Sequence, residues 1–179
     1  ELRPGCGSLS VDPVRSPALA IRFGKSKLRS RRIEIAQLED EMQTCFDRGW
    51  SDGLPIVPPT EARVIAMLAG TTRSPEERVA IVPPDLVPCS VEKVAINAVM
   101  AGCRPEYLPV VLTAVEAACT DRFNIHGLLA TTMSAGPVLI VNGPIRNKIE
   151  MNSGKNVLGQ GNRANNTIGR ALHLVVRNV

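Results

Sequence analysis

Aromatic residues are scarce in this sequence of 179 residues, which holds only three phenylalanines, one tyrosine and one tryptophan. A core must therefore consist mostly of valine, isoleucine, leucine and alanine, and the hydrophobic fraction of 44% is large enough to form one. The scarcity also argues against nucleic-acid recognition, in which unpaired bases commonly stack on aromatic side chains. Because no recognised nucleic-acid module is present either, we expect no nucleic-acid partner.

Long apolar runs and a secretory signal are both missing. No run reaches the ~18 residues that a membrane-spanning helix needs, and the sequence shows no secretory signal peptide. The cysteines do not suggest a disulfide framework, because their number is odd and no two form a Cys-x-x-Cys pair; they are Cys6, Cys45, Cys89, Cys103 and Cys119. These features predict a cytoplasmic protein with reduced thiols and no membrane partner.

The signatures of two common kinds of bound group are missing as well. The sequence has two histidines and no spaced cluster of ligands, so a zinc signature is absent. It also lacks Gly-x-Gly-x-x-Gly and the Walker lysine pattern, so it predicts no nucleotide site. We therefore predict that the chain binds no metal. The alternative is that Asp52, His126 and Glu150 converge on a metal ion. The sequence does not identify a cofactor.

The net charge of +4 comes from the first part of the chain. Residues 1–32 contain eight lysines and arginines against two acidic residues, whereas the rest contains 13 against 15. We therefore predict an extended basic arm over 1–30, with a short strand at Leu19–Phe23, and a single α/β domain over 31–179. The sequence lacks an initiator methionine and reaches Val179 within a helical pattern, so we expect a part of a longer chain or a subunit of a homo- or hetero-oligomer.

Helical and strand patterns alternate along the body. Apolar residues at three- and four-residue spacing predict helices over about 31–48 and 61–69, after Ser90, from Pro105 and over about 162–178. Short apolar runs bounded by turns predict strands at Val79–Val82, Gly127–Thr132 and Pro137–Val141, and Pro144–Ile149 forms a short further element. This order predicts an α/β or α+β fold, in which several helices pack on a small mixed sheet.

A glycine- and asparagine-rich stretch, Asn152–Arg170, leads into the last predicted helix. Free backbone N–H groups at a helix start bind anions, and Arg163 and Arg170 share one helix face, where they could clamp a carboxylate or phosphate. We therefore predict a small-molecule site made by Asn142, Gly143, Asn152, Ser153, Gly159, Gly161, Asn162 and Arg163. In the alternative interpretation, the glycines allow close packing, the arginines are surface charges, and Asn142-Gly143 is only a turn.

Three residues are candidates for catalysis. Cys103 precedes Arg104 and a helix start, two influences that favour a thiolate, so it is the best candidate nucleophile among the cysteines. His126 stands just before a predicted strand, where it could serve as a general base for Cys103. Asp52 lies in a proline-bound turn that could hold a carboxylate in place. The alternative is that all three have structural roles: Cys103 in a helix corner, His126 in a hydrogen bond and Asp52 in its own turn.

Several stretches together resemble one bacterial domain family, which is associated with proteins of the UGSC type, named for a selenocysteine/cysteine motif. The stretches are Trp50–Thr60, Val91–Val110, Phe123–Thr132, Val141–Ile145 and Asn152–Arg170. The triplet Cys6-Gly7-Ser8 is similar to the start of the motif, but Leu9 stands in place of its final cysteine. The resemblance covers about 50–179 and implies a homologous stretch that continues past Val179; it implies no established reaction.

Two functional hypotheses follow from the sequence. In the first, the chain is a subunit or fragment of a cytoplasmic enzyme that acts on a small polar or anionic substrate by thiol-dependent redox or lyase/hydrolase chemistry. In the second, it is a non-catalytic assembly subunit of a hetero-oligomer, and the basic arm and last helix are interface elements.

Overall fold

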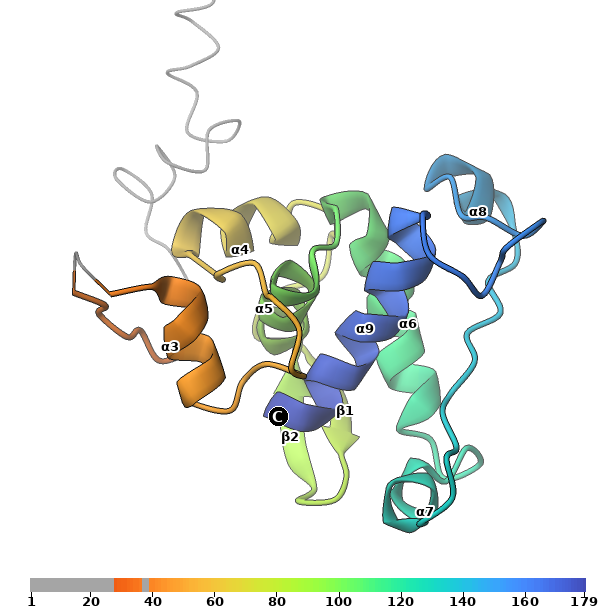
Figure 1. Cartoon of the computed structure of the whole chain (residues 1–179), viewed down its shortest axis with the longest axis horizontal. Helices are drawn as coiled ribbons and strands as arrows, with labels where there is room; N and C mark the ends of the chain where they lie inside the picture. Colours follow the sequence, from red (N-terminus) through yellow and green to blue (C-terminus); the bar gives the residue numbers. More distant parts are fainter. Residues whose placement is uncertain (1–27, 37–38) are drawn as a thin grey trace, which may run out of the picture.

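The computed structural model describes residues 28–36 and 39–179, which form an α+β fold (Figure 1). The predicted fold class is therefore confirmed. Helices make up most of the regular secondary structure, and the sheet is a two-stranded antiparallel hairpin instead of the predicted mixed sheet. In chain order the elements are α3 (Glu41–Asp47), α4 (Glu61–Leu68), β1 (Arg78–Val82), β2 (Val87–Ser90), α5 (Val91–Ala101), the 3-10 helix η1 (Pro105–Tyr107), α6 (Leu108–Ala118), α7 (Ile125–Ala130), α8 (Pro144–Lys148) and α9 (Arg163–Asn178).

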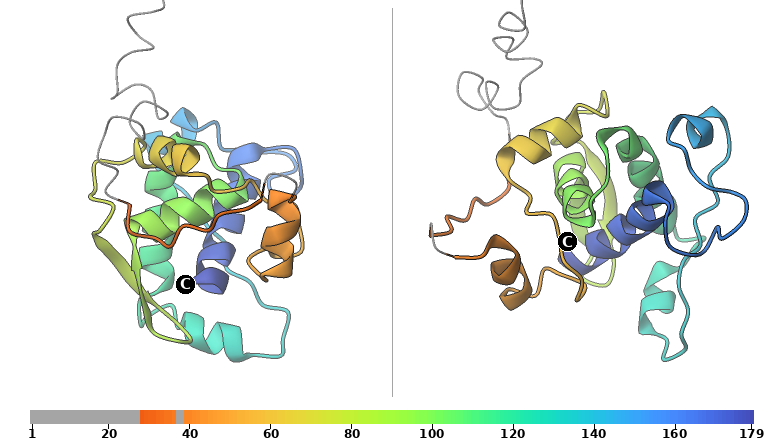
Figure 2. Two further views of the ribbon diagram at one scale, coloured as in Figure 1. Left: turned by 90° about the vertical axis from the view of Figure 1, so that its left-hand side faces the viewer. Right: turned by 45° about the horizontal axis from the view of Figure 1, so that its top comes forward.

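Helix α5 lies at the centre of the core. As predicted, Ser90 caps its first turn by accepting a hydrogen bond from the Lys93 N–H at 3.3 Å. Most of its residues are buried, because α4, α6 and α9 pack around it (Figures 1 and 2). Their apolar side chains are largely valine, leucine, isoleucine and alanine, as the scarcity of aromatic residues required.

The corner after α5 is made by Gly102, which adopts a left-handed conformation with φ of +87°. The Gly102 N–H donates to the Val99 carbonyl, and the Cys103 N–H donates to the Ala98 carbonyl. These two hydrogen bonds close the last turn of the helix. Pro105 then starts η1, which runs directly into α6. The predicted pair of helices with a tight break between them is thus confirmed.

The last helix, α9, is amphipathic and packs its apolar face on α5 and α6. Asn162 caps it by accepting a hydrogen bond from the Asn165 N–H at 3.0 Å. Six apolar side chains on its inner face are buried: Ala164, Ile168, Ala171, Leu172, Leu174 and Val175. The predicted helix over about 162–178 is confirmed.

The helix predicted over about 31–48 is wrong in its first part. Residues 31–36 are not helical, and α3 begins only at Glu41. The backbone N–H groups of Arg29 and Ser30 are held by the Glu92 carboxylate of α5 at 2.8 to 3.1 Å, and this contact lays the segment against the body. Asp40 accepts hydrogen bonds from Met42 and Gln43 and starts the helix there. The predicted strand at Leu19–Phe23 lies outside the described residues, as does most of the predicted arm.

Two predicted strands do not form, and one unpredicted strand does. Gly127–Thr132 was expected to be a strand, but α7 occupies Ile125–Ala130, capped by the Asn124 side chain on the Gly127 N–H at 3.2 Å. Pro137–Val141 has no strand partner among the described residues. The unpredicted strand β2 contains Pro88, which is tolerated because both strands of a two-stranded sheet are edges.

Candidate functional site

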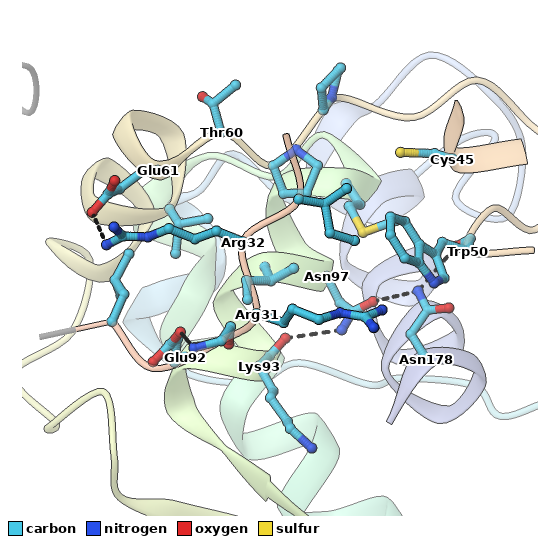
Figure 3. A pocket seen from close by; sticks show the side chains of 18 of the residues that line it. Arg31, Arg32, Cys45, Trp50, Thr60, Glu61, Glu92, Lys93, Asn97 and Asn178 are labelled. Carbon is cyan, nitrogen blue, oxygen red and sulfur yellow. Dashed lines mark hydrogen bonds and ion pairs between the residues drawn. The ribbon is translucent and has the colours of Figure 1, made fainter. Parts of the chain in front are cut away.

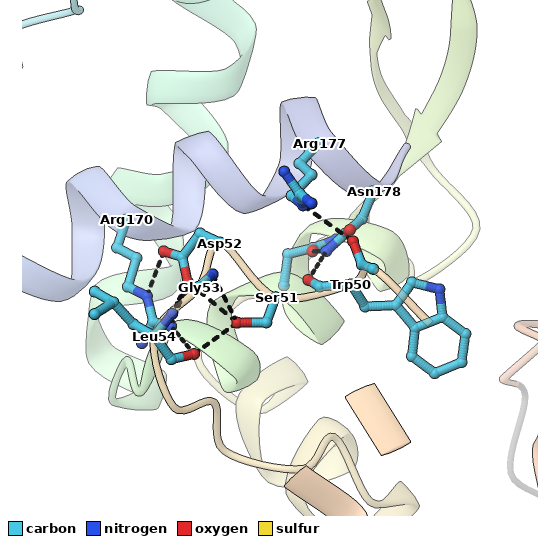
Figure 4. Close-up of polar contacts among 10 residues, drawn as sticks. Trp50, Ser51, Asp52, Gly53, Leu54, Arg170, Arg177 and Asn178 are labelled. Atoms are coloured by element: carbon cyan, nitrogen blue, oxygen red, sulfur yellow. Dashed lines mark hydrogen bonds and ion pairs between the residues drawn. The ribbon is translucent and has the colours of Figure 1, made fainter. Parts of the chain in front are cut away.

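The turn that carries Asp52 is fastened to α9 by three side chains of that helix (Figure 4). Arg170 donates to both carboxylate oxygens of Asp52, from Nε to Oδ2 at 2.8 Å and from Nη2 to Oδ1 at 2.7 Å. Arg177 donates to the Gly49 carbonyl at 3.0 Å, and Asn178 donates to the Trp50 carbonyl at 3.1 Å. The turn that the sequence predicted to position a carboxylate is therefore held to α9 at three points.

The hydrogen bonds from Arg170 decide what Asp52 can do chemically. They lower the pKa of its carboxyl group from 3.8 to about 2. A carboxylate with that pKa is a poor general base near neutral pH, because it gives little driving force for taking a proton. The arrangement thus favours a structural role for Asp52, and Arg170, one of the two arginines of the predicted clamp, is occupied by a carboxylate of the chain itself.

Cys103 does not have the environment predicted for a thiolate. Its side chain is buried, and burial raises the pKa of the thiol from 9.0 to about 11. The Sγ atom lies 3.4 Å from the Thr167 carbonyl oxygen of α9, to which it donates. Desolvation outweighs the Thr167 hydrogen bond and the Arg163 charge, which both lower the pKa, so the thiol stays protonated near neutral pH.

His126 and Cys103 lie at opposite ends of α6. Cys103 precedes η1 and the start of α6, whereas His126 lies on α7, which follows the end of α6 (Figures 1 and 2). A helix of the length of α6 separates its ends by roughly 16 Å, and the His126 side chain is exposed to solvent. The predicted nucleophile–base pair is therefore not formed. Among the described residues, no three histidine, cysteine, aspartate or glutamate side chains are grouped to hold a metal ion, so Asp52, His126 and Glu150 do not converge.

The asparagines of the glycine-rich stretch hold the loop itself together. Asn152 accepts from the Gly154 N–H and donates to the Lys155 carbonyl, each at 3.0 Å. Asn162, besides capping α9, donates to the Glu150 carbonyl at 2.8 Å. Asn165 donates to the Asn152 and Val157 carbonyls and accepts from the Asn152 N–H. These side-chain amides are engaged in a folded loop, an arrangement that the alternation of asparagine and glycine could have suggested.

The other predicted ligand-binding residues are divided among three places. Gly159 donates its N–H to the Asn156 carbonyl, Gly161 has φ of +107°, and Ser153 is exposed. Arg163 donates from Nε to the Gly102 carbonyl at 2.9 Å and so lies beside the Cys103 corner. Asn142 and Gly143 lie apart from this loop, just before α8. Gly143 has φ of +91° and directly precedes the first residue of that helix.

A cavity of about 520 Å³, shown in Figure 3, was not predicted from the sequence. Its lining comes from five separate stretches: residues 28–35, 41–50, 58–64, 92–100 and 178–179. Near its polar side, the Asn97 side chain is 3% exposed, accepts from Asn178 at 2.8 Å and donates to the Lys93 carbonyl at 3.0 Å. No local motif signals such a site, because it exists only when the five stretches are brought together.

A second feature that the sequence analysis missed is an apolar surface that follows α6. From Phe123 to Ile145 the chain contains no aspartate, glutamate, lysine or arginine. Five large apolar side chains in this stretch are exposed: Phe123, Leu129, Met133, Val138 and Ile140. Beside it, a groove of about 480 Å³ is lined by α6 and by residues 139–145. We call the stretch Phe123–Ile145 the uncharged segment.

The backbone of the uncharged segment is partly unpaired. Residues 138–142 form no helix or strand, and their N–H and C=O groups make no hydrogen bond in the described structure. Leu139 and Val141 are half-buried, whereas Val138 and Ile140 are exposed, and this alternation is the pattern of a β-strand with one covered face. The predicted strand does not form, but the run has the sequence and the exposure pattern of a strand that lacks a neighbour.

No protein family, curated protein or solved structure matched this chain when it was compared with known proteins. The resemblance to the UGSC-type family therefore stays a prediction. Within the two described ranges, every helix is too short or too polar to span a lipid bilayer.

Proposed function

We propose that this chain is an assembly subunit that joins a second copy of itself through the uncharged segment. The observation that carries the proposal is the run of unpaired backbone groups at 138–142 within a surface that has no charged side chain. Soluble proteins normally protect an unpaired strand edge with charges, proline, a bulge or a covering element, because an open edge pairs with other chains. Here Pro137 precedes the unpaired run and Pro144 follows it, but the run itself contains neither a charge nor a proline.

A second copy suits this surface because the sequence Val-Leu-Ile-Val-Asn is compatible with itself. In an antiparallel pair centred on Ile140, Leu139 of one copy lies opposite Val141 of the other, and Val138 lies opposite Asn142. No like charges meet, and β-branched and apolar pairs of this kind stabilise a sheet. A two-fold axis makes the same surface serve both copies, which is the commonest arrangement of homo-oligomers.

The apolar side chains of the uncharged segment support the same interpretation. Ile140 is 82% exposed and Met133 is 77% exposed, and large apolar side chains of this kind would be covered where two copies meet. The neighbouring groove against α6 could receive side chains of the partner at the edge of the paired strands. We keep the cytoplasm as the proposed compartment, because the cysteines in the described part of the chain are free thiols.

Light scattering coupled to size-exclusion chromatography tests the proposal. The wild-type chain is expected to elute as a dimer at micromolar concentration in reducing buffer, and Ile140→Lys is expected to elute as a monomer. The matched control is Leu158→Lys, which places the same charge at an 88% exposed position outside the uncharged segment and is expected to leave the dimer intact. A wild-type chain that is monomeric at 100 μM would contradict the proposal.

Catalysis on a small anionic substrate is the second candidate function. The cavity of about 520 Å³ favours it, because its size is typical of small-molecule sites. The hydrogen-bonded Asp52, the protonated Cys103 and the peripheral His126 do not support the catalytic roles predicted for them. If Cys103→Ser and His126→Gln both left a measured turnover intact, these roles would be excluded while binding in the cavity would not.

A further inference from the structure

The cavity in Figure 3 has mostly apolar walls and a polar side formed by two asparagines. The walls come from the extended segment 28–35, from α3, α4 and α5, and from the turn that holds Trp50. The polar side is formed by Asn97 of α5 and Asn178 of α9, joined by a hydrogen bond of 2.8 Å. A ligand that fits this lining needs an apolar body and a small polar end.

The charged side chains that line the cavity are mostly engaged elsewhere. Arg32 pairs with Glu61 at 2.8 Å, and Lys93 donates from Nζ to the Pro88 carbonyl at 3.3 Å. Glu92 accepts the N–H groups of Arg29 and Ser30. Two lining charges, those of Arg31 and Glu41, have no hydrogen bond or ion pair within the described residues.

Of these two side chains, Arg31 is the one placed to meet a ligand. Figure 3 shows it extending from the segment that covers α5 toward the polar side, in the direction of Asn97 and Asn178. Arg31 and Glu41 are both exposed, but Glu41 belongs to α3 and not to the segment next to the two asparagines. The indole N–H of Trp50, which also lines the cavity, is a second donor without an acceptor in the described structure.

We infer that this cavity binds a small carboxylate with an apolar body, whose carboxylate pairs with Arg31 and whose apolar part contacts Trp50, Ile96 and Met100. A guanidinium group binds a carboxylate through two parallel hydrogen bonds, which a neutral polar end group cannot form. The apolar walls exclude water from the remainder of the ligand. The site lies outside the uncharged segment, so it does not depend on the proposed assembly.

The presence of one tryptophan in the chain makes the site directly measurable. Trp50 lines the cavity, so its fluorescence and its indole N–H resonance both report on an occupant. Octanoate is the probe, 1-octanol is the neutral analogue of the same chain length, and octylamine carries the opposite charge. We expect octanoate to change the Trp50 signals saturably at millimolar concentration or below, and to bind more tightly than either analogue.

Two arginine variants complete the experiment. Arg31→Gln is expected to weaken octanoate binding by about 10-fold or more, because it removes a charge-assisted pair, and to leave the weaker binding of 1-octanol unchanged. The octanol arm shows that the variant still forms the cavity. Arg104→Gln, at an exposed arginine outside the cavity, is the matched control and should behave as wild type. Unchanged octanoate affinity in Arg31→Gln, equal binding of octylamine, or no octanoate response at Trp50 would each overturn the inference.

Discussion

Arg170 of α9 and Asp52 form a two-hydrogen-bond ion pair between residues 118 positions apart in the sequence. Arg170 also donates to the Leu54 carbonyl at 3.2 Å, so one guanidinium group holds the turn at two points. The pair connects the last helix to the turn that leads into α4, and it lies at the edge of the core rather than within it. It is therefore a clamp between distant parts of the chain.

The Asp52–Arg170 pair predicts a pH dependence of stability. The pKa of Asp52 is about 2 in the folded chain and 3.8 without the pair, so the stabilisation is complete above pH 4 and is lost as the pH falls toward 2. We expect Asp52→Asn to lower the free energy of unfolding by about 1 kcal/mol at pH 7, after allowance for solvent screening, and by less at pH 2.5. Urea unfolding at both pH values measures this.

Asp85→Asn is the matched control, because Asp85 is exposed and has no partner in the described structure. It is expected to change stability by less than about 0.5 kcal/mol at either pH. An Asp52→Asn deficit that stays constant down to pH 2.5 would show that the carboxylate charge is not what holds the turn.

Burial of Cys103 predicts that its thiol reacts slowly. Because burial raises the pKa of the thiol to about 11, little thiolate exists at pH 8, and the side chain is also out of reach of solvent. We expect iodoacetamide to modify the half-buried Cys119 before Cys103 in the native chain, and both at similar rates in 6 M guanidinium chloride. Peptide mass spectrometry separates the two sites. Faster native labelling at Cys103 would restore it as a candidate nucleophile.

Replacement by alanine is expected to have opposite effects on stability at Gly70 and at Gly169. A Cβ atom at Gly70 would collide with the backbone carbonyl of Pro105, which cannot move without shifting η1. Gly70→Ala should therefore destabilise the chain by about 2 kcal/mol or more. Gly169 lies within α9 with nothing near its missing Cβ, so Gly169→Ala should stabilise it by about 0.5–1 kcal/mol through helix propensity. Thermal unfolding compares the two, and a stabilising Gly70→Ala would contradict the packing of α4 on η1.

The Glu92 carboxylate holds the segment that contains Arg29 and Ser30 against α5. The Glu92 side chain is 3% exposed and accepts three hydrogen bonds from the N–H groups of Arg29 and Ser30. Glu92→Gln keeps the shape but removes the charge, so we expect a loss of about 1–2 kcal/mol. Amide hydrogen exchange at Ser30 should become faster in the variant, while the relative exchange rates of the α9 amides stay as in the wild type. Unchanged exchange at Ser30 would mean that other contacts hold the segment.

The sequence predicted the helices around the core better than the periphery. The apolar spacing in α5, α6 and α9 was sufficient there, and the caps that Ser90 and Asn162 form in the structure agree with it. At 31–36 the same spacing was misleading, since the contact of Glu92 with Ser30 comes from 62 residues away in the sequence. At Gly127–Thr132 the cap provided by Asn124 was overlooked, so an apolar run that could form either a helix or a strand was assigned wrongly.

The candidate site shows the same limit. Asparagine and glycine at Asn152–Arg163 predicted an anion-binding loop, but the amide groups bond to the loop's own backbone instead. The pairing of Asp52 with Arg170 and the burial of Cys103 depend on how α9 packs, which no local pattern specifies. The charge-free stretch from Phe123 to Ile145, by contrast, can be read directly from the sequence, but the proposal of an interface also needs the unpaired backbone, which only the structure shows.

Amide hydrogen exchange at Val138–Asn142, measured as a function of protein concentration, tests the proposed assembly most directly. In a single copy these five N–H groups make no hydrogen bond in the described structure, so they should exchange nearly as fast as in an unfolded peptide when the chain is dilute. Antiparallel pairing of two copies predicts that alternate N–H groups in this run become protected as the concentration rises. Fast exchange of all five amides at every concentration up to 1 mM would contradict the account.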